Sequence, residues 1–108
     1  MTPSDAVRRL ALAHQHLGVV YHAARDFDRA QHHYSESIRL YEAQGDIYGA
    51  AQSRYDAALA LANAGRPADA RQYAEAALRG YQIYGSGAAE GVEHTLALIA
   101  IIAKAATP

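Results

Sequence analysis

The sequence predicts an all-α protein, an α-solenoid built from antiparallel helical hairpins. The main observation is an internal repeat, because a shift of 40 residues places identical or similar residues on one another. A second observation is that no alternating run of Val, Ile and Thr indicates a β-strand. The aligned pairs are Gly45 and Gly85, Tyr41 and Tyr81, Ala30 and Ala70, Ala11 and Ala51, and Ile38 and Leu78.

The start of the first helix is marked by three residues. Thr2 is a candidate N-cap, Pro3 suits the first helical position, and Asp5 places an acid in the first turn. These signals predict a first helix over about residues 3–24. The turn that follows contains Asp26, which is a candidate N-cap for the second helix.

The later helices are separated by the same kinds of residues. Gly45 and Gly65 are candidate helix-ending glycines, Asp46 is a candidate N-cap, and Pro67 can open a helix. The predicted helices cover about residues 3–24, 27–43, 47–64, 67–84 and 88–105. Short loops make neighbouring helices antiparallel. They form a single domain, residues 1–108, with repeat one at about 3–43, repeat two at about 46–84 and a terminal helix at about 88–105.

Composition excludes several classes of function. The 10 basic and 11 acidic residues are interspersed and give a net charge of −1, so no basic stripe is present to contact nucleic acid. The absence of cysteine excludes disulfides, cysteine-based metal sites and cysteine nucleophiles. We expect no membrane partner, because the apolar run at residues 95–103 is too short to span a bilayer. No signal peptide is recognised at the first residues, so the predicted location is cytoplasmic.

The repeated residues resemble the tetratricopeptide repeat (TPR). The first repeat contains Leu17-Gly18-x-x-Tyr21, then Phe27, and then Ala30, Tyr34 and Ser37 in its second helix. The second contains Ala57-Ala58-x-x-Leu61, Gly65, Ala70, Ala74 and Ala77-Leu78, and Ala97-Leu98-x-x-Ile101 begins a third copy. The resemblance implies a right-handed solenoid of two repeats plus one terminal helix. Its structural repeat positions would be Leu17, Gly18, Tyr21, Ala30, Tyr34, Ala58, Leu61, Ala70 and Leu78.

The chain departs from the family pattern at several positions. Arg25 stands in place of the turn glycine of repeat one, and Pro67 in place of the turn aromatic of repeat two. No tryptophan stands at the usual sites, which are occupied by His14 and Arg54. The 40-residue spacing and the lead-in at residues 45–50 resemble the longer repeats of bacterial, especially actinobacterial, regulators.

The resemblance also implies an inner groove lined by the first helix of each hairpin. Lysine and arginine are absent from these positions, which disfavours clamping of a peptide carboxylate. The aliphatic and aromatic residues there suit an apolar helix or an extended peptide. The predicted groove residues are Leu12, Gln15, Val19, His22, Gln52, Tyr55, Leu59, Asn63, Ile99 and Ile102, with Val92 and Thr95 on the same face of the terminal helix.

The terminal helix predicts self-association. Its residues 96–103 are apolar nearly all round, and a helix of this kind is normally buried on more than one side. Leu98, Ile101 and Ile102 stand at i, i+3 and i+4 and are expected to form one apolar ridge. The chain is either a piece of a longer repeat array or is covered by another molecule here. We expect a homodimer, because twofold symmetry is the commonest way to close such a contact.

Histidines are concentrated in the first predicted hairpin. No pair of them has the i, i+4 spacing of a helical zinc site, so they are interpreted as surface and interface residues and no metal or cofactor is expected. A titration with Zn²⁺ would distinguish the two interpretations. No catalytic residues are predicted, because repeated hairpins offer a groove in place of a dry cleft. The five histidines of this hairpin, out of six in the chain, are His14, His16, His22, His32 and His33.

The sequence therefore predicts a noncatalytic protein–protein interaction module. It would bind an apolar peptide or helix in its groove, self-associate through its terminal helix, or do both. The alternative is a ligand- or peptide-sensing regulatory segment of a bacterial transcriptional regulator or signalling NTPase. An adjoining nucleotide-binding or DNA-binding domain would favour this alternative.

Overall fold

The computed structural model describes residues 2–106, so residues 1, 107 and 108 of the predicted domain lie outside the described residues. The described chain forms five α-helices and one short 3-10 helix, η1, and contains no strand. This confirms the all-α prediction, and the helix bounds lie within one residue of those expected. The elements are α1 (Pro3–Ala23), α2 (Phe27–Ala43), α3 (Ile47–Asn63), α4 (Pro67–Tyr84), η1 (Ser86–Ala88) and α5 (Ala89–Ala105).

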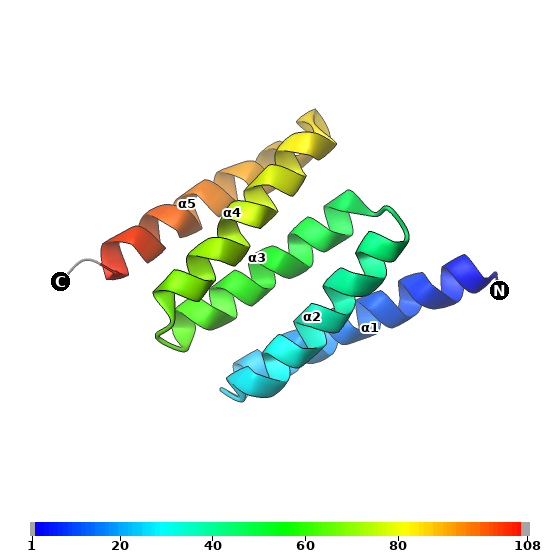
Figure 1. The fold of residues 1–108 in the computed structure, drawn as a ribbon, viewed down its shortest axis with the longest axis horizontal. Helices are drawn as coiled ribbons and strands as arrows, with labels where there is room; N and C mark the ends of the chain where they lie inside the picture. Colours follow the sequence, from blue (N-terminus) through cyan, green and yellow to red (C-terminus); the bar gives the residue numbers. More distant parts are fainter. Residues whose placement is uncertain (1, 107–108) are drawn as a thin grey trace.

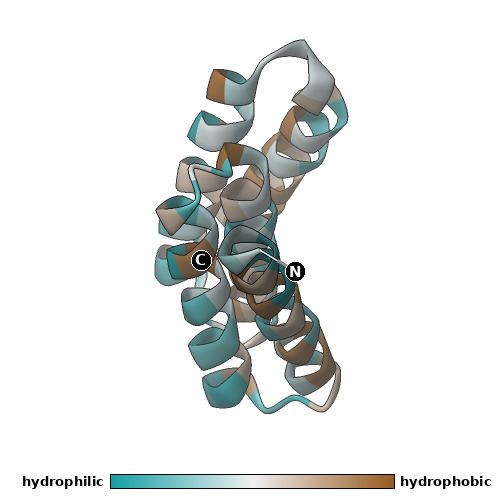
Figure 2. Ribbon diagram, turned by 90° about the vertical axis from the view of Figure 1, so that its right-hand side faces the viewer, coloured by the Kyte–Doolittle hydropathy of each residue, from teal (hydrophilic) through white to brown (hydrophobic). Residues whose placement is uncertain are grey.

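The helices lie side by side along the longest dimension of a thin slab measuring 51 × 33 × 17 Å. Figure 1 shows the two ends of the chain at opposite ends of this slab. Each helix packs on the next along the chain, and α3 also contacts α1 and α5. Helices α1, α3 and α5 therefore form one layer, which Figure 2 shows edge on with more apolar positions than the layer of α2 and α4.

The predicted helix starts are made by the expected side chains. The Thr2 hydroxyl accepts a hydrogen bond from the Asp5 amide at 3.1 Å, and Asp5 reaches back to Thr2 to complete a capping box. Asp26 accepts from the Arg29 amide at 3.2 Å, and Asp46 accepts from the Gly49 amide at 2.8 Å. Each cap satisfies a helical N–H that has no partner within the helix.

Helices α1, α2 and α3 end in the same type of turn, which contains one residue in the left-handed region. Gly45 has φ 68° and Gly65 has φ 75°, which glycine adopts without steric cost. The corresponding residue after α1 is Arg25, with φ 60°. Arg25 therefore takes the place of the turn glycine without a change in the type of turn.

Small side chains fill the contacts between helices. Three glycines pack directly on tyrosine rings: Gly18 on Tyr34, Gly49 on Tyr41, and Gly91 on Tyr81. A methyl group in any of these places would overlap the ring. Alanines fill most of the remaining core, and helix α3 alone buries Ala50, Ala51, Ala57, Ala58 and Ala60. Helix backbones can therefore approach closely.

The third copy of the repeat does not begin where the 40-residue period places it. Gly49 of α3 and Gly91 of α5 make the same contact, each with the tyrosine near the end of the preceding helix. Ser53 and Thr95, four residues further on, are both fully buried. Both pairs are 42 residues apart, so the predicted register of Ala97-Leu98-x-x-Ile101 is wrong by two residues. The physical reason is the extra 3-10 turn, η1, between α4 and α5.

This shift corrects the predicted ridge on the terminal helix. Leu98 and Ile102 are 4% and 1% exposed and pack in one cluster with Ala58, Leu61 and Ala70. Of the three predicted residues only Ile101 is exposed, at 63%. The prediction of a single exposed ridge is therefore wrong, because Leu98 and Ile102 face α3 and α4 while Ile101 points away from them.

The structural repeat positions are buried with three exceptions. Gly18, Ala30, Tyr34, Ala58, Leu61 and Ala70 are buried as expected. Tyr21 is half-buried and stacks on the His33 ring, with centroids 5.3 Å apart, and Leu78 is half-buried as well. Leu17 is 40% exposed. Its counterpart Ala57 is buried because α3 packs on α2, whereas within the described residues no helix precedes α1.

Residues 86–105 reach the length and mean hydropathy, 1.2, of a helix that could cross a membrane. This segment contains Glu90, Glu93 and Lys104 and is therefore longer than the uncharged apolar run at residues 95–103, and the absence of a membrane partner stays a prediction. One such helix is weak evidence for a membrane span, because a helix that packs in a core passes the same test. Ala88, Leu98 and Ile102 of this segment are buried against the other helices.

Candidate peptide-binding groove

A cavity of about 240 Å³ opens on the layer formed by α1, α3 and α5. It lies between Gln15 of α1 and the first turns of α5, with α3 in the middle. Its lining is rich in hydroxyl, amide and carboxylate groups. The lining residues are Gln15, Tyr48, Gln52, Tyr55, Asp56, Tyr81, Glu90, Gly91 and His94.

Asp56 is held in this cavity by a chain of two hydrogen bonds. Gln15 Nε2 donates to Asp56 Oδ2 at 3.1 Å, and Tyr41 Oη donates to Gln15 Oε1 at 3.1 Å. The Gln15 side chain is buried, so the network fixes which way its amide points. Burial raises the pKa of the Asp56 carboxyl, and the Gln15 hydrogen bond and the nearby His22 oppose this rise.

Tyr81 forms one wall of the cavity and is 4% exposed. Its ring packs on Gly91 and meets the Tyr48 ring edge to face, with centroids 5.6 Å apart. Its hydroxyl makes no hydrogen bond to any residue that the structure describes. Burial, with the neighbouring Tyr48, Asp56 and Tyr55, raises the pKa of the Tyr81 phenol.

The predicted groove residues differ in accessibility. Leu12 and Val19 of α1 are 44% and 48% exposed, and Gln52 and Asn63 of α3 are also exposed. The half-buried ones are His22, Tyr55, Leu59 and Ile99, together with Val92. Gln15, Ile102 and Thr95 are buried, so they shape the groove from below and do not face solvent.

Two of the predicted groove residues meet across helices. Asn63 Nδ2 lies 2.7 Å from His22 Nε2, which joins the C-terminal turns of α3 and α1. Tyr55 and Gln52 line the cavity described above. The sequence reasoning missed Asp56, Tyr48, Tyr81, Glu90 and His94. An isolated acid directly before the apolar run at residues 57–62 was the available signal for Asp56.

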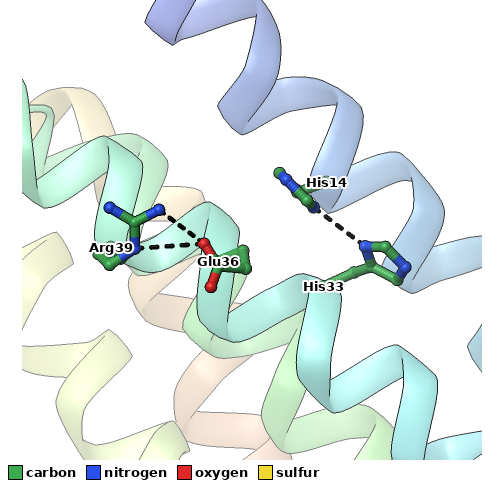
Figure 3. Close-up of polar contacts among 4 residues, drawn as sticks. All are labelled: His14, His33, Glu36 and Arg39. Carbon is green, nitrogen blue, oxygen red and sulfur yellow. Dashed lines mark hydrogen bonds and ion pairs between the residues drawn. The ribbon is translucent and has the colours of Figure 1, made fainter.

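The histidines of the first hairpin form a contact that spacing along one helix does not reveal. His14 Nδ1 of α1 lies 3.0 Å from His33 Nδ1 of α2, so one imidazole donates a hydrogen bond to the other (Figure 3). His32 packs edge to face on His33. Burial, with the nearby His14 and His32, lowers the pKa of His33. No group of three metal-ligating side chains occurs among residues 2–106.

Figure 3 also shows the ion pair that lies one turn further along α2. Arg39 Nη2 and Nε donate to Glu36 Oε2 at 2.7 and 3.2 Å, and this lowers the pKa of the Glu36 carboxyl. Neither group is within a cavity. The Ser35, Ser37, His32 and His33 side chains of this helix are not arranged as nucleophile and base, because Ser37 instead hydrogen-bonds with Ser53.

A second hollow, of about 400 Å³, lies between the ends of α2 and α4 and the start of α3. Two of its charged lining residues already pair with each other, since Arg54 Nη2 donates to Glu42 Oε1 at 2.8 Å. Ile47 and Ile83 are its exposed aliphatic residues. The cavity near Asp56 is the better candidate site, because the hydroxyls of Tyr48, Tyr55 and Tyr81 in its lining make no hydrogen bond in the described chain.

The comparisons with known proteins agree with the geometry. The model of one protein family, described as the tetratricopeptide repeat, matches residues 8–83. No curated protein and no solved structure matches the chain.

Proposed function

The chain belongs to the tetratricopeptide-repeat family, whose members generally mediate protein–protein interaction, and from this premise we propose that it binds a peptide in the groove along α1, α3 and α5. The observation that carries the proposal is the cavity at Asp56, which lies in the same layer as the exposed aliphatic residues Leu12 and Val19. Apolar contacts would supply area, and the cavity would accept one polar side chain of the ligand.

We propose no catalytic role for the groove. Family members are typically noncatalytic, and Asp56 hydrogen-bonds to Gln15 and not to a base or nucleophile. The cavity is also smaller than the roughly 300 Å³ at which pockets for drug-sized ligands begin. A peptide lying along the layer therefore fits better than a small effector molecule enclosed in it, which makes the sensing alternative secondary.

The test begins with selection of binding peptides from a random peptide library displayed on phage. Calorimetry then measures the dissociation constant of a selected peptide for the wild-type chain and for Val19→Ala, Tyr55→Ala and Leu59→Ala. We expect each groove variant to weaken binding at least tenfold, because side chains at an interface centre contribute roughly 1.4–3 kcal/mol.

Ile83→Ala is the matched control, because Ile83 is 71% exposed and lies in the other hollow. Its affinity should equal that of the wild type. Val19→Ala truncates an exposed side chain and should leave the stability of the fold unchanged, so weaker binding by this variant reports a lost contact with the peptide. Equal affinity in all three groove variants would place the binding surface elsewhere.

Self-association is a second candidate function, supported by the outer stripe of α5. On this stripe Leu96 is 51% and Ile101 63% exposed, and Ala97 and Ala100 lie between them. An antiparallel pair of α5 helices related by a twofold axis midway between residues 98 and 99 would set Leu96 against Ile101, Ala97 against Ala100, and Glu93 against Lys104.

This stripe is therefore self-complementary in size and in charge. Glu93 and Lys104 are exposed and belong to none of the ion pairs in the described chain. A twofold contact uses the same patch on both copies, so each favourable pair occurs twice. We therefore propose a homodimer through Leu96 and Ile101, in place of the predicted contact through Leu98 and Ile102.

A further inference from the structure

The chemistry of the cavity at Asp56 indicates which side chain of a partner it accepts, an inference that rests on the proposed peptide-binding function. Two carboxylates, Asp56 and Glu90, line it, and its other ionisable lining groups are tyrosines and His94. No lysine or arginine is among the lining residues. The half-buried Asp56 carboxylate forms none of the ion pairs in the described chain, and only the Gln15 hydrogen bond and the nearby His22 stabilise its charge. A buried charge with so little compensation is unfavourable.

Hydrogen-bond acceptors exceed donors in this cavity. The Asp56 carboxylate accepts one hydrogen bond, from Gln15, and has capacity for several more. The hydroxyl of Tyr81 makes no hydrogen bond in the described chain and, unlike that of Tyr34, is not closed off from solvent, so it is accessible to a ligand in the cavity. The hydroxyls of Tyr48 and Tyr55 make no hydrogen bonds to described residues either. The two carboxylates can only accept and the tyrosine hydroxyls can accept as well, so the lining suits a ligand that donates several hydrogen bonds.

We propose that this cavity binds the guanidinium group of an arginine side chain of the partner peptide. A guanidinium presents five N–H donors in a planar fork, which matches the unpaired oxygens of Asp56 and Tyr81. Its flat face stacks on aromatic rings, and Tyr48 and Tyr55 supply such rings in the lining. The cavity volume of about 240 Å³ suits one long side chain. Entry of the cation neutralises the Asp56 carboxylate.

The direct test uses a small probe in place of the unidentified partner. Nα-acetyl-L-arginine amide is titrated into ¹⁵N-labelled chain at pH 7.5 and followed by backbone amide chemical shifts. We expect saturable shifts centred on Gln52, Tyr55, Asp56 and His94. Nα-acetyl-L-citrulline amide, which has the same shape without the charge, should bind at least tenfold more weakly.

Two variants assign the effect to the cavity. Asp56→Asn should weaken arginine-probe binding at least tenfold and abolish the preference over citrulline, and Tyr81→Phe should weaken it about threefold. Asp56→Asn can still accept the Gln15 hydrogen bond and removes a half-buried charge, so it should fold at least as stably as the wild type. Asp28→Asn, which removes an exposed charge on α2, is the matched control and should bind like the wild type.

The outcomes separate this inference from the proposed function. Equal binding of the arginine and citrulline probes, or an unchanged affinity in Asp56→Asn, would overturn the inference. If peptides selected on the groove bind through Val19 and Leu59 but contain no arginine, the peptide-binding function stands and the inference fails. If the arginine probe binds at Asp56 while no peptide binds the groove, the inference stands and the proposed function fails.

Discussion

Arg25 shows how a single residue can occupy a backbone conformation that its neighbours in the repeat leave to glycine. The turn after α1 has the same hydrogen bonds as the turns at Gly45 and Gly65, including one from the Asp26 amide to the Tyr21 carbonyl at 2.9 Å. The Arg25 guanidinium lies 5.1 Å from the centre of the Phe27 ring. This contact offsets part of the cost of a left-handed residue with a side chain.

Replacing Arg25 by glycine should stabilise the chain. The relief of the left-handed conformation is worth about 1–2 kcal/mol, and the lost contact with Phe27 costs about 0.5–1 kcal/mol, so we expect a net gain of up to about 1.5 kcal/mol. Urea denaturation of Arg25→Gly measures this. Gly65→Ala, at the equivalent position after α3, should lose about 1 kcal/mol by the same argument. A loss of stability in Arg25→Gly would contradict it.

The paired histidines make stability depend on pH in a definite direction. The pKa of His33 is lowered below its ordinary 6.5 in the folded chain, so the unfolded chain takes up a proton first as the pH falls. The free energy of unfolding should therefore decrease as the pH falls from 6.5 through the lowered pKa. Melting temperatures between pH 7.5 and 5 test this, and the decrease should be smaller in His33→Gln. An unchanged pH profile in that variant would contradict the argument.

At the scale of a helix, glycine on tyrosine is the contact that positions α5. A Cβ atom on Gly91 would lie 2.8 Å from Tyr81 Cε1, so either the buried ring or the helix must shift. Gly91→Ala should lower the free energy of unfolding by about 1–3 kcal/mol through overpacking. The control is Gly87→Ala, whose nearest neighbour at 3.0 Å belongs to the exposed Tyr84. Equal stability of the two variants would contradict this role of Gly91.

Much of the helical arrangement could be predicted because it depends on local chemistry. Caps such as Asp26 and Asp46 and glycines such as Gly45 act on their own turns, so the sequence alone locates the helix ends. The orientation of α5 was not predictable in this way. Ser86–Ala88 forms one more turn than the equivalent loop before α3, and two residues rotate a helix by about 200°. Leu98 and Ile102 consequently turned inward.

The candidate site was predicted only in its location. The family pattern placed Tyr55 and Leu59 on the layer that α1, α3 and α5 form, and their role in binding stays a prediction. The hydrogen bond from Gln15 to Asp56 joins residues 41 positions apart, and the His14–His33 contact joins two helices. Such contacts depend on how the helices are rotated against one another, and periodicity along one helix contains no information about them.

For the whole molecule, the state of association depends on the outer stripe of α5. Burying an exposed leucine or isoleucine contributes roughly 1.5–3 kcal/mol before the entropy of association is counted. Light scattering after size exclusion should give twice the mass of the chain at tens of micromolar. Ile101→Glu should shift the mass towards the monomer. Ile83→Glu, which replaces a similarly exposed isoleucine on α4, should not.

A charge exchange distinguishes the proposed twofold contact from other apolar contacts. Lys104→Glu would set two glutamates against each other and should weaken the dimer, and adding Glu93→Lys should restore it. Failure of the double variant to recover would contradict the antiparallel pairing. A monomer in the wild type at these concentrations would contradict self-association altogether.

The central place of α3 has a consequence for how the molecule opens. This helix contacts all four other helices, and its buried residues are almost all alanine, glycine or serine. Because a short isolated helix is only marginally stable, α3 depends on packing against these neighbours. Local opening should therefore begin at α1 or α5, and amide hydrogen exchange should be slowest in α3. A peptide lying across α1, α3 and α5 would link the two helices that open first. Occupancy of the groove would then convert a molecule that opens from its ends into one that opens as a single cooperative unit.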